Sequence, residues 1–171
     1  MINKKVLDAI NEQINKEVYS AYFYQSMAAY ASYEGLNGIA NWFNVQVQEE
    51  LSHAKVFYNY VIQQGEKIEL KAIEQPPVEF ESPKQLFEQT LEHEKYVSRL
   101  INDLYSLAKK ENDNATEILL QWFVSEQVEE EANASDILSK FKMVGGEASG
   151  LFMIDTELAK RVFTPPSILA N

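Results

Sequence analysis

Hydrophobic residues recur at spacings of three and four positions along most of the chain. This spacing returns side chains to one face of an α-helix and is typical of a stripe that faces a protein core. Four long stripes are separated by turn-forming residues, and a shorter apolar segment follows the last one. The pattern predicts an all-α protein with helices over residues 6–34, 39–64, 83–110, 115–143 and 147–162.

The segment between the second and third predicted helices is unusual for a helical bundle. Residues 65–82 contain Pro76 and Pro77 and precede Pro83, which excludes the interior of a helix. Connections in bundles usually take about two to eight residues, whereas this segment, fully extended, could span roughly 59 Å. A helix of about 28 residues is roughly 42 Å long. The segment can therefore cross the whole bundle, which predicts a third helix parallel to the second, with Ser82 as its N-cap.

Each long stripe is interrupted near its middle by acidic or otherwise metal-binding residues. The interruptions are Glu17 in the first stripe, Glu50 and His53 in the second, Glu94 in the third, and Gln127 and Glu130 in the fourth. With the third helix parallel to the second, the four glutamates lie about 17 to 26 Å from one end of the bundle. An up-down-up-down order would align them as well. In either arrangement the interruptions share one layer to within about two helical turns.

Four carboxylates in one buried layer need positive partners. Buried charge is costly unless it is paired or bound to a metal, and two divalent cations would neutralise four glutamates. Oxygen-rich ligation with one imidazole suits iron or manganese, and zinc can compete. The alternative for any single helix is a tilted glutamate whose carboxylate reaches solvent, but four helices interrupted at one level favour a metal site.

Composition narrows the remaining possibilities. The chain has 171 residues, which favours one domain, and a formal charge of −11, which argues against nucleic-acid binding. It has no cysteine, which excludes disulfides, thiolate metal sites and iron–sulfur clusters. We find no apolar run of about 18 residues and no signal-peptide pattern at the N-terminus. These features predict a cytoplasmic protein without a membrane span.

The interruptions approach the ligand pattern of known di-iron carboxylate bundles, in which two helices each supply a Glu and two supply Glu-x-x-His. Here the second pair is Gln127-x-x-Glu130 instead. Over essentially its full length the sequence resembles the non-haem ferritins of bacteria and archaea. The matching stretches are residues 11–17, 49–54, 92–95, 127–131 and 151–155.

This resemblance implies a ferritin-like four-helix bundle with a long crossover between the second and third helices and a short fifth helix. It also implies a homo-oligomeric shell of 24 subunits that oxidises Fe(II) with O2 or H2O2 and stores a ferric oxide mineral. By position, Glu17, Glu50 and His53 resemble the ligands of a first iron site. Glu50 would bridge to a second iron site that includes Glu94 and Glu130.

The resemblance assigns roles to further residues. Gln127 resembles the polar group beside the second iron, and Tyr24 the tyrosine that donates a hydrogen bond or an electron to the centre. Glu49, Glu126 and Glu129, together with Glu130, resemble a third iron site. The simpler alternatives are an acidic surface for these glutamates and core packing for Tyr24.

Related families fit less well. Ser52 stands where haem-binding relatives place a methionine between subunits, so we expect no haem. The lack of cysteine excludes rubrerythrin-like proteins, and residues 147–162 argue against mini-ferritins, which lack a fifth helix. His93 lies off the stripe of the third helix, which predicts a surface or subunit contact rather than a ligand. A di-iron oxidase or peroxidase without storage, and a metal-free structural bundle, remain as alternatives.

Overall fold

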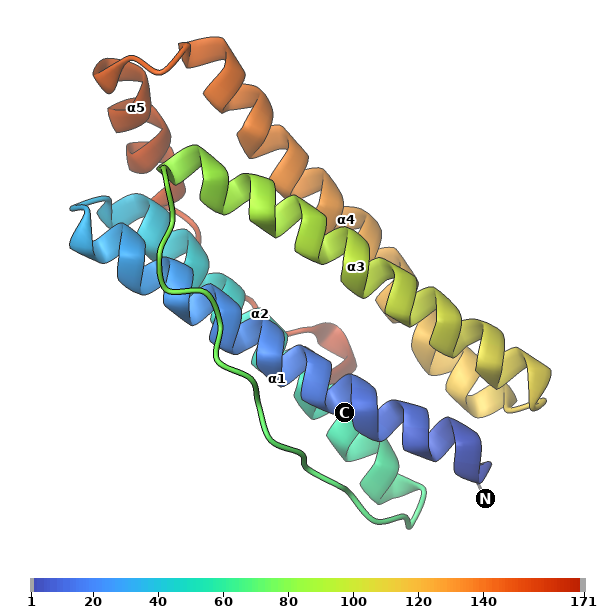
Figure 1. Cartoon of the computed structure of the whole chain (residues 1–171). Helices are drawn as coiled ribbons and strands as arrows, with labels where there is room; N and C mark the ends of the chain where they lie inside the picture. The colour runs from blue at the N-terminus through green and yellow to red at the C-terminus, as the bar shows by residue number, and fades with distance from the viewer. Residues whose placement is uncertain (1, 170–171) are drawn as a thin grey trace.

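Two helical hairpins lie side by side and form a four-helix bundle (Figure 1). The computed structural model describes residues 2–169. The helices are α1 (Lys4–Tyr33), α2 (Asn37–Gln63), α3 (Pro83–Lys110), α4 (Asn114–Val144), α5 (Ala148–Leu158) and a short 3-10 helix, η1 (Ser167–Leu169). The first hairpin is α1 with α2, and the second is α3 with α4. The predicted all-α bundle with a short fifth helix is confirmed.

The segment between α2 and α3 runs along the whole length of the bundle, so that α3 starts at the same end as α2 (Figure 1). This confirms the predicted crossover and the parallel direction of α3. Side chains of α1 hold the crossover in place: Asn11 and Asn15 accept hydrogen bonds from the backbone N–H groups of Glu69 (3.0 Å) and Lys71 (3.2 Å). At the start of α3, the side chain of Ser82 accepts a hydrogen bond from a backbone N–H of the first turn, as an N-cap does.

The hydrophobic core is divided into two clusters, one near each end of the bundle. The cluster near the α1–α2 turn is built around Tyr24, Met27, Ile39, Phe43, Phe87 and Ile137. The cluster at the opposite end is built around Ile10, Ile14, Phe57, Ile101, Leu120 and Phe123. On every long helix the interrupting polar residues lie between the positions that belong to the two clusters. The polar layer is therefore enclosed by apolar packing on both sides.

Helix α5 packs across the end of the bundle against α2 and α4. Its Asp155 Oδ1 accepts a hydrogen bond from the backbone N–H of Ile39 at 2.8 Å, in the first turn of α2. The two backbones approach so closely at Gly38 that an added Cβ would lie 1.7 Å from the carbonyl oxygen of Asp155. Gly38 is therefore required for the docking of α5.

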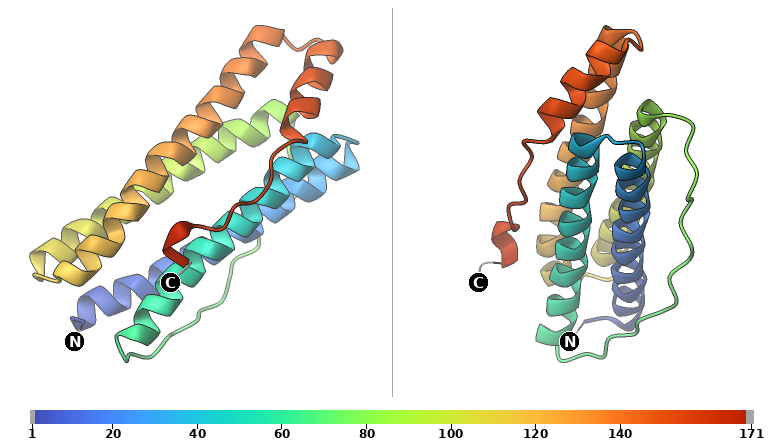
Figure 2. Two further views of the ribbon diagram at one scale, coloured as in Figure 1. Left: turned by 180° about the vertical axis from the view of Figure 1, so that it is seen from behind. Right: turned by 90° about the vertical axis from the view of Figure 1, so that its left-hand side faces the viewer.

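The expected end of the fifth helix at residue 162 is wrong, because α5 ends at Leu158. The Asn41 side-chain amide donates to the carbonyl oxygens of Leu158 (3.3 Å), Ala159 (3.4 Å) and Arg161 (3.0 Å). These contacts hold the chain against α2 in a conformation that does not continue the helix. Figure 2 shows the segment after α5 running beside α2. None of the helices within residues 2–169 is long and apolar enough to cross a membrane.

We expect Gly38→Ala to weaken the docking of α5 by about 1 to 3 kcal/mol, the usual cost of forcing extra volume into a packed contact. Trypsin cleavage after Lys160 or Arg161 should then become roughly tenfold faster. Asn37→Ala is the matched control, because Asn37 is the exposed residue next to Gly38 at the start of α2. Equal cleavage rates in both variants would show that the close approach does not hold α5.

Candidate metal centre

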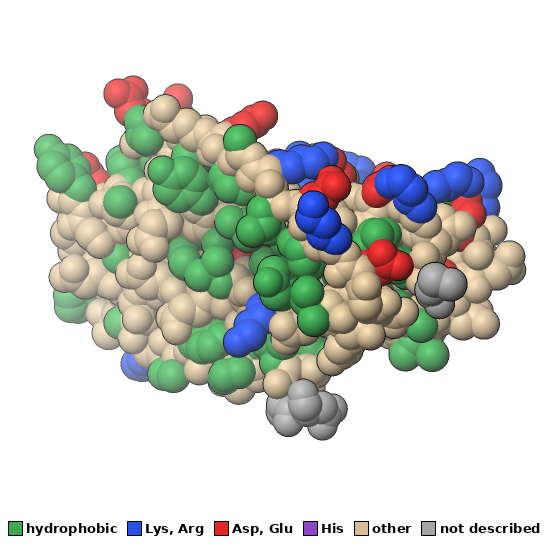
Figure 3. Space-filling view, turned by 90° about the horizontal axis from the view of Figure 1, so that it is seen from below, with side chains coloured by type: hydrophobic (Ala, Val, Ile, Leu, Met, Phe, Trp, Pro, Cys, Tyr) green, Lys and Arg blue, Asp and Glu red, His purple; other side chains and the backbone are tan. Residues whose placement is uncertain are grey.

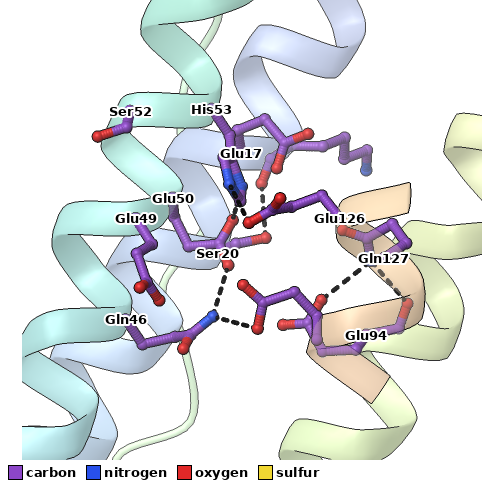
Figure 4. A network of polar contacts seen from close by, with 12 residues as sticks. Glu17, Ser20, Gln46, Glu49, Glu50, Ser52, His53, Glu94, Glu126 and Gln127 are labelled. Atoms are coloured by element: carbon purple, nitrogen blue, oxygen red, sulfur yellow. Dashed lines mark hydrogen bonds and ion pairs between the residues drawn. The ribbon is translucent and has the colours of Figure 1, made fainter. Parts of the chain in front are cut away.

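The polar layer brings together five titratable side chains from four helices. Glu17 of α1, Glu50 and His53 of α2, Glu94 of α3 and Glu130 of α4 each expose 5% or less of their surface. They meet because each lies on the core-facing stripe of its own helix at the same depth. The structure thus gathers all five residues that the sequence predicts as ligands of the paired iron sites (Figure 4 shows much of this layer).

Two buried amides orient three of the carboxylates. Gln13 Nε2 donates to Glu17 Oε1 at 2.8 Å, one helical turn away. Gln46 Nε2 donates to Glu50 Oε1 at 3.2 Å and to Glu130 Oε2 at 2.9 Å, and so connects α2 with α4. An amide donor stabilises a carboxylate without adding a net charge. The layer therefore gains hydrogen bonds but remains strongly acidic.

Glu94 is held by two further groups. Gln127 Nε2 donates to Glu94 Oε2 at 3.1 Å, so the predicted polar neighbour lies beside the layer (Figure 4). The Tyr24 hydroxyl donates a short hydrogen bond to Glu94 Oε1. Burial, followed by the charge of Glu94, raises the pKa of Tyr24 well above its usual range, so this hydroxyl keeps its proton and acts as a donor.

Some ligand atoms in the layer are left without a hydrogen-bond partner. Among the described residues, only three buried side-chain atoms lack one, and two of these are Glu17 Oε2 and His53 Nε2. One ligand atom each from Glu17, Glu50 and His53 lie within 4.8 Å of one another, and so do atoms of His53, Glu126 and Glu130. Oxygen donors around one imidazole, with atoms not engaged by the protein, fit a hard or borderline divalent metal such as iron.

The carboxyl groups of the layer hold protons more strongly than exposed ones do. Burial raises the pKa values of Glu17, Glu94 and Glu130 to about 8. Burial, with the charge of Glu130, raises the pKa of Glu50 as well. The next largest cause in each case is a neighbouring carboxylate, because like charges in a low dielectric repel strongly. Near neutral pH the metal-free layer is therefore partly protonated, and bound cations would replace protons.

Comparison with known proteins agrees with this geometry. The family model of the ferritin-like domain matches residues 7–144. The chain belongs to the ferritin family. A bacterial non-heme ferritin of Bacteroides fragilis is 42% identical over 161 residues, which are 94% of this chain and 100% of that protein. One from Staphylococcus aureus is 36% identical over 163 residues, or 95% of this chain and 98% of the relative.

Solved structures support the same assignment. A ferritin of Archaeoglobus fulgidus engineered into a closed form superposes with a TM-score of 0.94, at 47% identity, over 96% of this chain and 100% of that one. An open-pore ferritin of the same archaeon gives a TM-score of 0.93 at 46% identity, over 95% of this chain and 100% of that one. At this identity the likeness extends beyond the fold to the family itself.

The predicted third iron site of this ferritin is only partly assembled. Glu126 Oε1 lies 3.9 Å from His53 Nε2, next to the paired sites. Glu129 is exposed, and Glu49 accepts a hydrogen bond from Arg161. Neither Glu49 nor Glu129 belongs to the two clusters of close ligand atoms found among the described residues. The third site stays a prediction.

His93 is half-buried and lines a surface pocket beside α1, and its predicted role as a subunit contact stays a prediction. Its Nε2 lies 2.8 Å from Ser20 Oγ on α1, and its ring centroid lies 4.9 Å from that of Phe23. Burial, aided by the charge of Lys16, lowers the pKa of His93 to about 4. The residue lies beside the core stripe of α3, on a flank that α1 covers. The spacing of residues along α3 alone does not predict that α1 covers this side of the helix.

The sequence alone assigns no role to three residues that contact the layer or Glu49. Gln13 and Gln46 each precede a buried glutamate by four residues, and this spacing is the signal that could have revealed them. Arg161 falls at the end of the expected fifth helix, where no periodicity relates it to α2. Its contacts depend on the early end of α5.

We expect Glu17→Gln to stabilise the metal-free protein, and to do so more strongly as the pH rises from about 5 to about 8.5. The Glu17 carboxyl has a pKa of about 8 in the folded chain, against 4.5 as its ordinary value. A raised carboxyl pKa makes the folded state bind more protons, so its stability falls with rising pH across that window. The glutamine avoids this penalty, and its amide N–H can donate to the neighbouring carboxylate of Glu50.

Thermal unfolding of the metal-free protein across this pH range measures the effect. At about 1.4 kcal/mol per pKa unit the gain is at most a few kcal/mol per subunit at high pH. Glu34→Gln, on an exposed residue after α1, is the matched control and should show no such trend. A Glu17→Gln protein that gains nothing between the two pH limits would contradict the assignment of a strained, buried carboxyl.

Proposed function

We propose that this ferritin stores iron and that it first oxidises Fe(II) to Fe(III) at the buried carboxylate layer. Family membership supports the storage role. The observation that carries the ferroxidase role is the layer itself: each of four helices contributes a buried glutamate, and one buried imidazole accompanies them. Fe(II) is here a substrate, which binds, is oxidised and moves on.

Close ligand atoms support the first of the two proposed iron positions, and the resemblance to ferritins supports the second. Glu17, Glu50 and His53 form a close cluster that would hold the first ion. Glu50 would bridge to a second ion between Glu94 and Glu130. Gln46 donates to both Glu50 and Glu130, so the bridging carboxylate and its neighbour on α4 keep a fixed relation before iron arrives.

Charge explains why such a layer favours oxidation. Anionic ligands stabilise Fe(III) relative to Fe(II), because they interact more strongly with the higher charge. Two Fe(II) ions supply two electrons, which with two protons reduce one O2 to H2O2 or one H2O2 to two waters. Carboxyl groups with pKa values of about 8 release protons when iron binds, close to where an oxidant would consume them. Tyr24 holds Glu94 by its hydroxyl and would lie beside the second ion.

Assembly into a shell of 24 subunits is part of the proposal. Exposed hydrophobic side chains gather on the face seen in Figure 3. A groove in the first hairpin and the crossover is almost wholly apolar, and its lining residues include Val18, Ala21, Tyr22, Val47, Leu51 and Ile73. Apolar surface of this kind marks contact sites for other proteins, and a second copy of this chain is the occupant that the ferritin assignment supports. The cytoplasmic location stays a prediction.

A di-iron oxidase or peroxidase without storage would use the same layer. Particle mass and iron content separate the two functions. Storage predicts a large shell that takes up far more iron than its paired sites can bind, whereas an oxidase would form a small oligomer with about two irons per chain. A metal-free structural bundle would bind no iron, and the unpartnered atoms of Glu17 and His53 argue against it.

We expect the Glu50→Ala and His53→Ala double variant to lose more than about tenfold in the initial rate of Fe(II) oxidation. Changes to residues that merely support metal ligands already cost about 10- to 100-fold, and this variant removes the bridge and the imidazole. Ferric absorbance after aerobic addition of Fe(II) to the metal-free protein measures the rate. Glu92→Ala, on an exposed glutamate two residues before Glu94, should keep the parent rate. An unchanged rate in the double variant would place the oxidation elsewhere.

A further inference from the structure

The side chain of Arg161 lies against α2 next to the carboxylate layer. Its guanidinium carbon is 4.4 Å from the ring centroid of Trp42, and its Nη1 donates to Gln46 Oε1 at 2.8 Å. Its Nη2 donates to Glu49 Oε2 in a short ion pair. Trp42, Gln46 and Glu49 follow one another at spacings of four and three, so they share one face of α2. The guanidinium is thus held by an aromatic ring, an amide and a carboxylate.

The backbone holds Arg161 in this place independently of its side chain. Asn41 donates to the carbonyl oxygen of Arg161 at 3.0 Å. A few residues earlier, Asp155 holds α5 to the first turn of α2. Figure 2 shows that the chain then continues beside α2. Loss of the guanidinium would therefore leave the segment attached by its other contacts.

Arg161 also stands apart by its charge. Among the residues that the structure describes, it is the one lysine or arginine that forms an ion pair with any glutamate proposed here as an iron ligand. An arginine stays protonated in proteins, and its planar fork matches a carboxylate. Glu49 is one of the glutamates predicted for the third iron site, yet it is engaged by this cation.

We propose that Arg161 is a built-in counter-cation of the metal centre, which holds Glu49 until a metal ion takes this carboxylate as a ligand and displaces it. The inference rests on the proposed function, because it requires that the layer binds metal. The exchange breaks the contact between guanidinium and carboxylate and forms a metal–oxygen bond, while the arginine keeps its proton. Metal binding that depends on Glu49 is thereby kept weak, which suits an ion that must move on to storage.

The same guanidinium contacts the paired sites through Gln46. Its bond to Gln46 Oε1 fixes the amide so that Nε2 faces Glu50 and Glu130. Arg161 is therefore a positioning residue for the paired sites and a competitor at Glu49. A residue that only pinned the C-terminal segment to α2 would have neither effect on metal binding.

The test uses Zn2+, which does not change its oxidation state, and the assembled, full-length protein after metal removal. Equilibrium binding per subunit is compared for the parent, Arg161→Gln, Glu49→Gln and the double variant. Lys160→Gln is the matched control, since it removes one positive charge from the adjacent, exposed position. Arg161→Lys keeps a cation near Trp42 without the fork, and it serves as a second variant if Arg161→Gln does not fold.

We expect Arg161→Gln to bind the weakest-bound Zn2+ ions about tenfold more tightly than the parent does. The reason is that the guanidinium of Arg161 no longer competes with the metal for the Glu49 carboxylate. Arg161→Lys should show a smaller gain, and Lys160→Gln none. The gain should vanish when Glu49→Gln is also present. Equal affinities in the parent and Arg161→Gln, or a gain that survives Glu49→Gln, would overturn the proposal.

Trp42 offers a second readout that does not depend on activity. Trp42 and Trp122 are the two tryptophans of the chain, so Trp122→Phe isolates the emission of Trp42. Zn2+ beyond the first two equivalents should then change this emission as the guanidinium leaves the ring. The same titration in Trp122→Phe with Arg161→Gln should give no such change. Emission that stays constant in both proteins would show that Arg161 is not displaced.

The Zn2+ titration distinguishes a failure of the metal centre from a failure of the proposed role of Arg161. If the parent protein binds fewer than two Zn2+ ions per subunit tightly, both the assignment of the metal centre and the proposed function are wrong. If two Zn2+ ions bind tightly and the affinity for the weaker ions is the same with and without Arg161, the metal centre stands and only the role of Arg161 is wrong.

Discussion

The constraint on which this structure depends is the burial of four glutamates at one level of a helical bundle. An apolar layer at this level would pack without cost, whereas buried carboxyl groups lose hydration and repel one another. The bundle accepts them because two apolar clusters enclose the layer and the long helices extend through both clusters. The layer thus lowers the stability of the metal-free fold, and bound cations would offset this loss.

The residues around the layer reduce this cost without neutralising it. Gln13, Gln46 and Gln127 supply amide donors, and Tyr24 supplies a hydroxyl. None of these groups carries a positive charge near neutral pH, so the attraction for metal remains. The one permanent cation that pairs with a candidate ligand, within the part of the chain the structure describes, sits at the edge on Glu49. The arrangement therefore favours metal binding among the four buried glutamates and weakens it at Glu49.

Much of the fold could be predicted from the sequence because its signals are periodic and local. Each long helix shows its core stripe, and the prolines before Pro83 require a connection that is not helical. The candidate ligands interrupt these stripes, so a pattern along one helix identifies Glu17 or Glu94 without knowledge of its neighbours. The resemblance to ferritins then assigned roles that no spacing implies, such as a bridge at Glu50.

The parts that were not predicted depend on contacts between distant segments. The end of α5 at Leu158 is set by the side chain of Asn41, more than a hundred residues earlier in the chain. The contacts of His93 with α1 depend on Ser20 and Phe23, and the position of Arg161 depends on α2. These contacts join segments that are far apart in the sequence, so the periodicity of one helix does not predict them.

The most direct test of the central claim is anomalous diffraction at the iron edge from crystals soaked with Fe(II) without oxygen. The account predicts two iron positions in each subunit, one among Glu17, Glu50 and His53 and the other among Glu50, Glu94 and Glu130. Iron found only outside this layer, with the layer itself free of anomalous signal, would contradict the account.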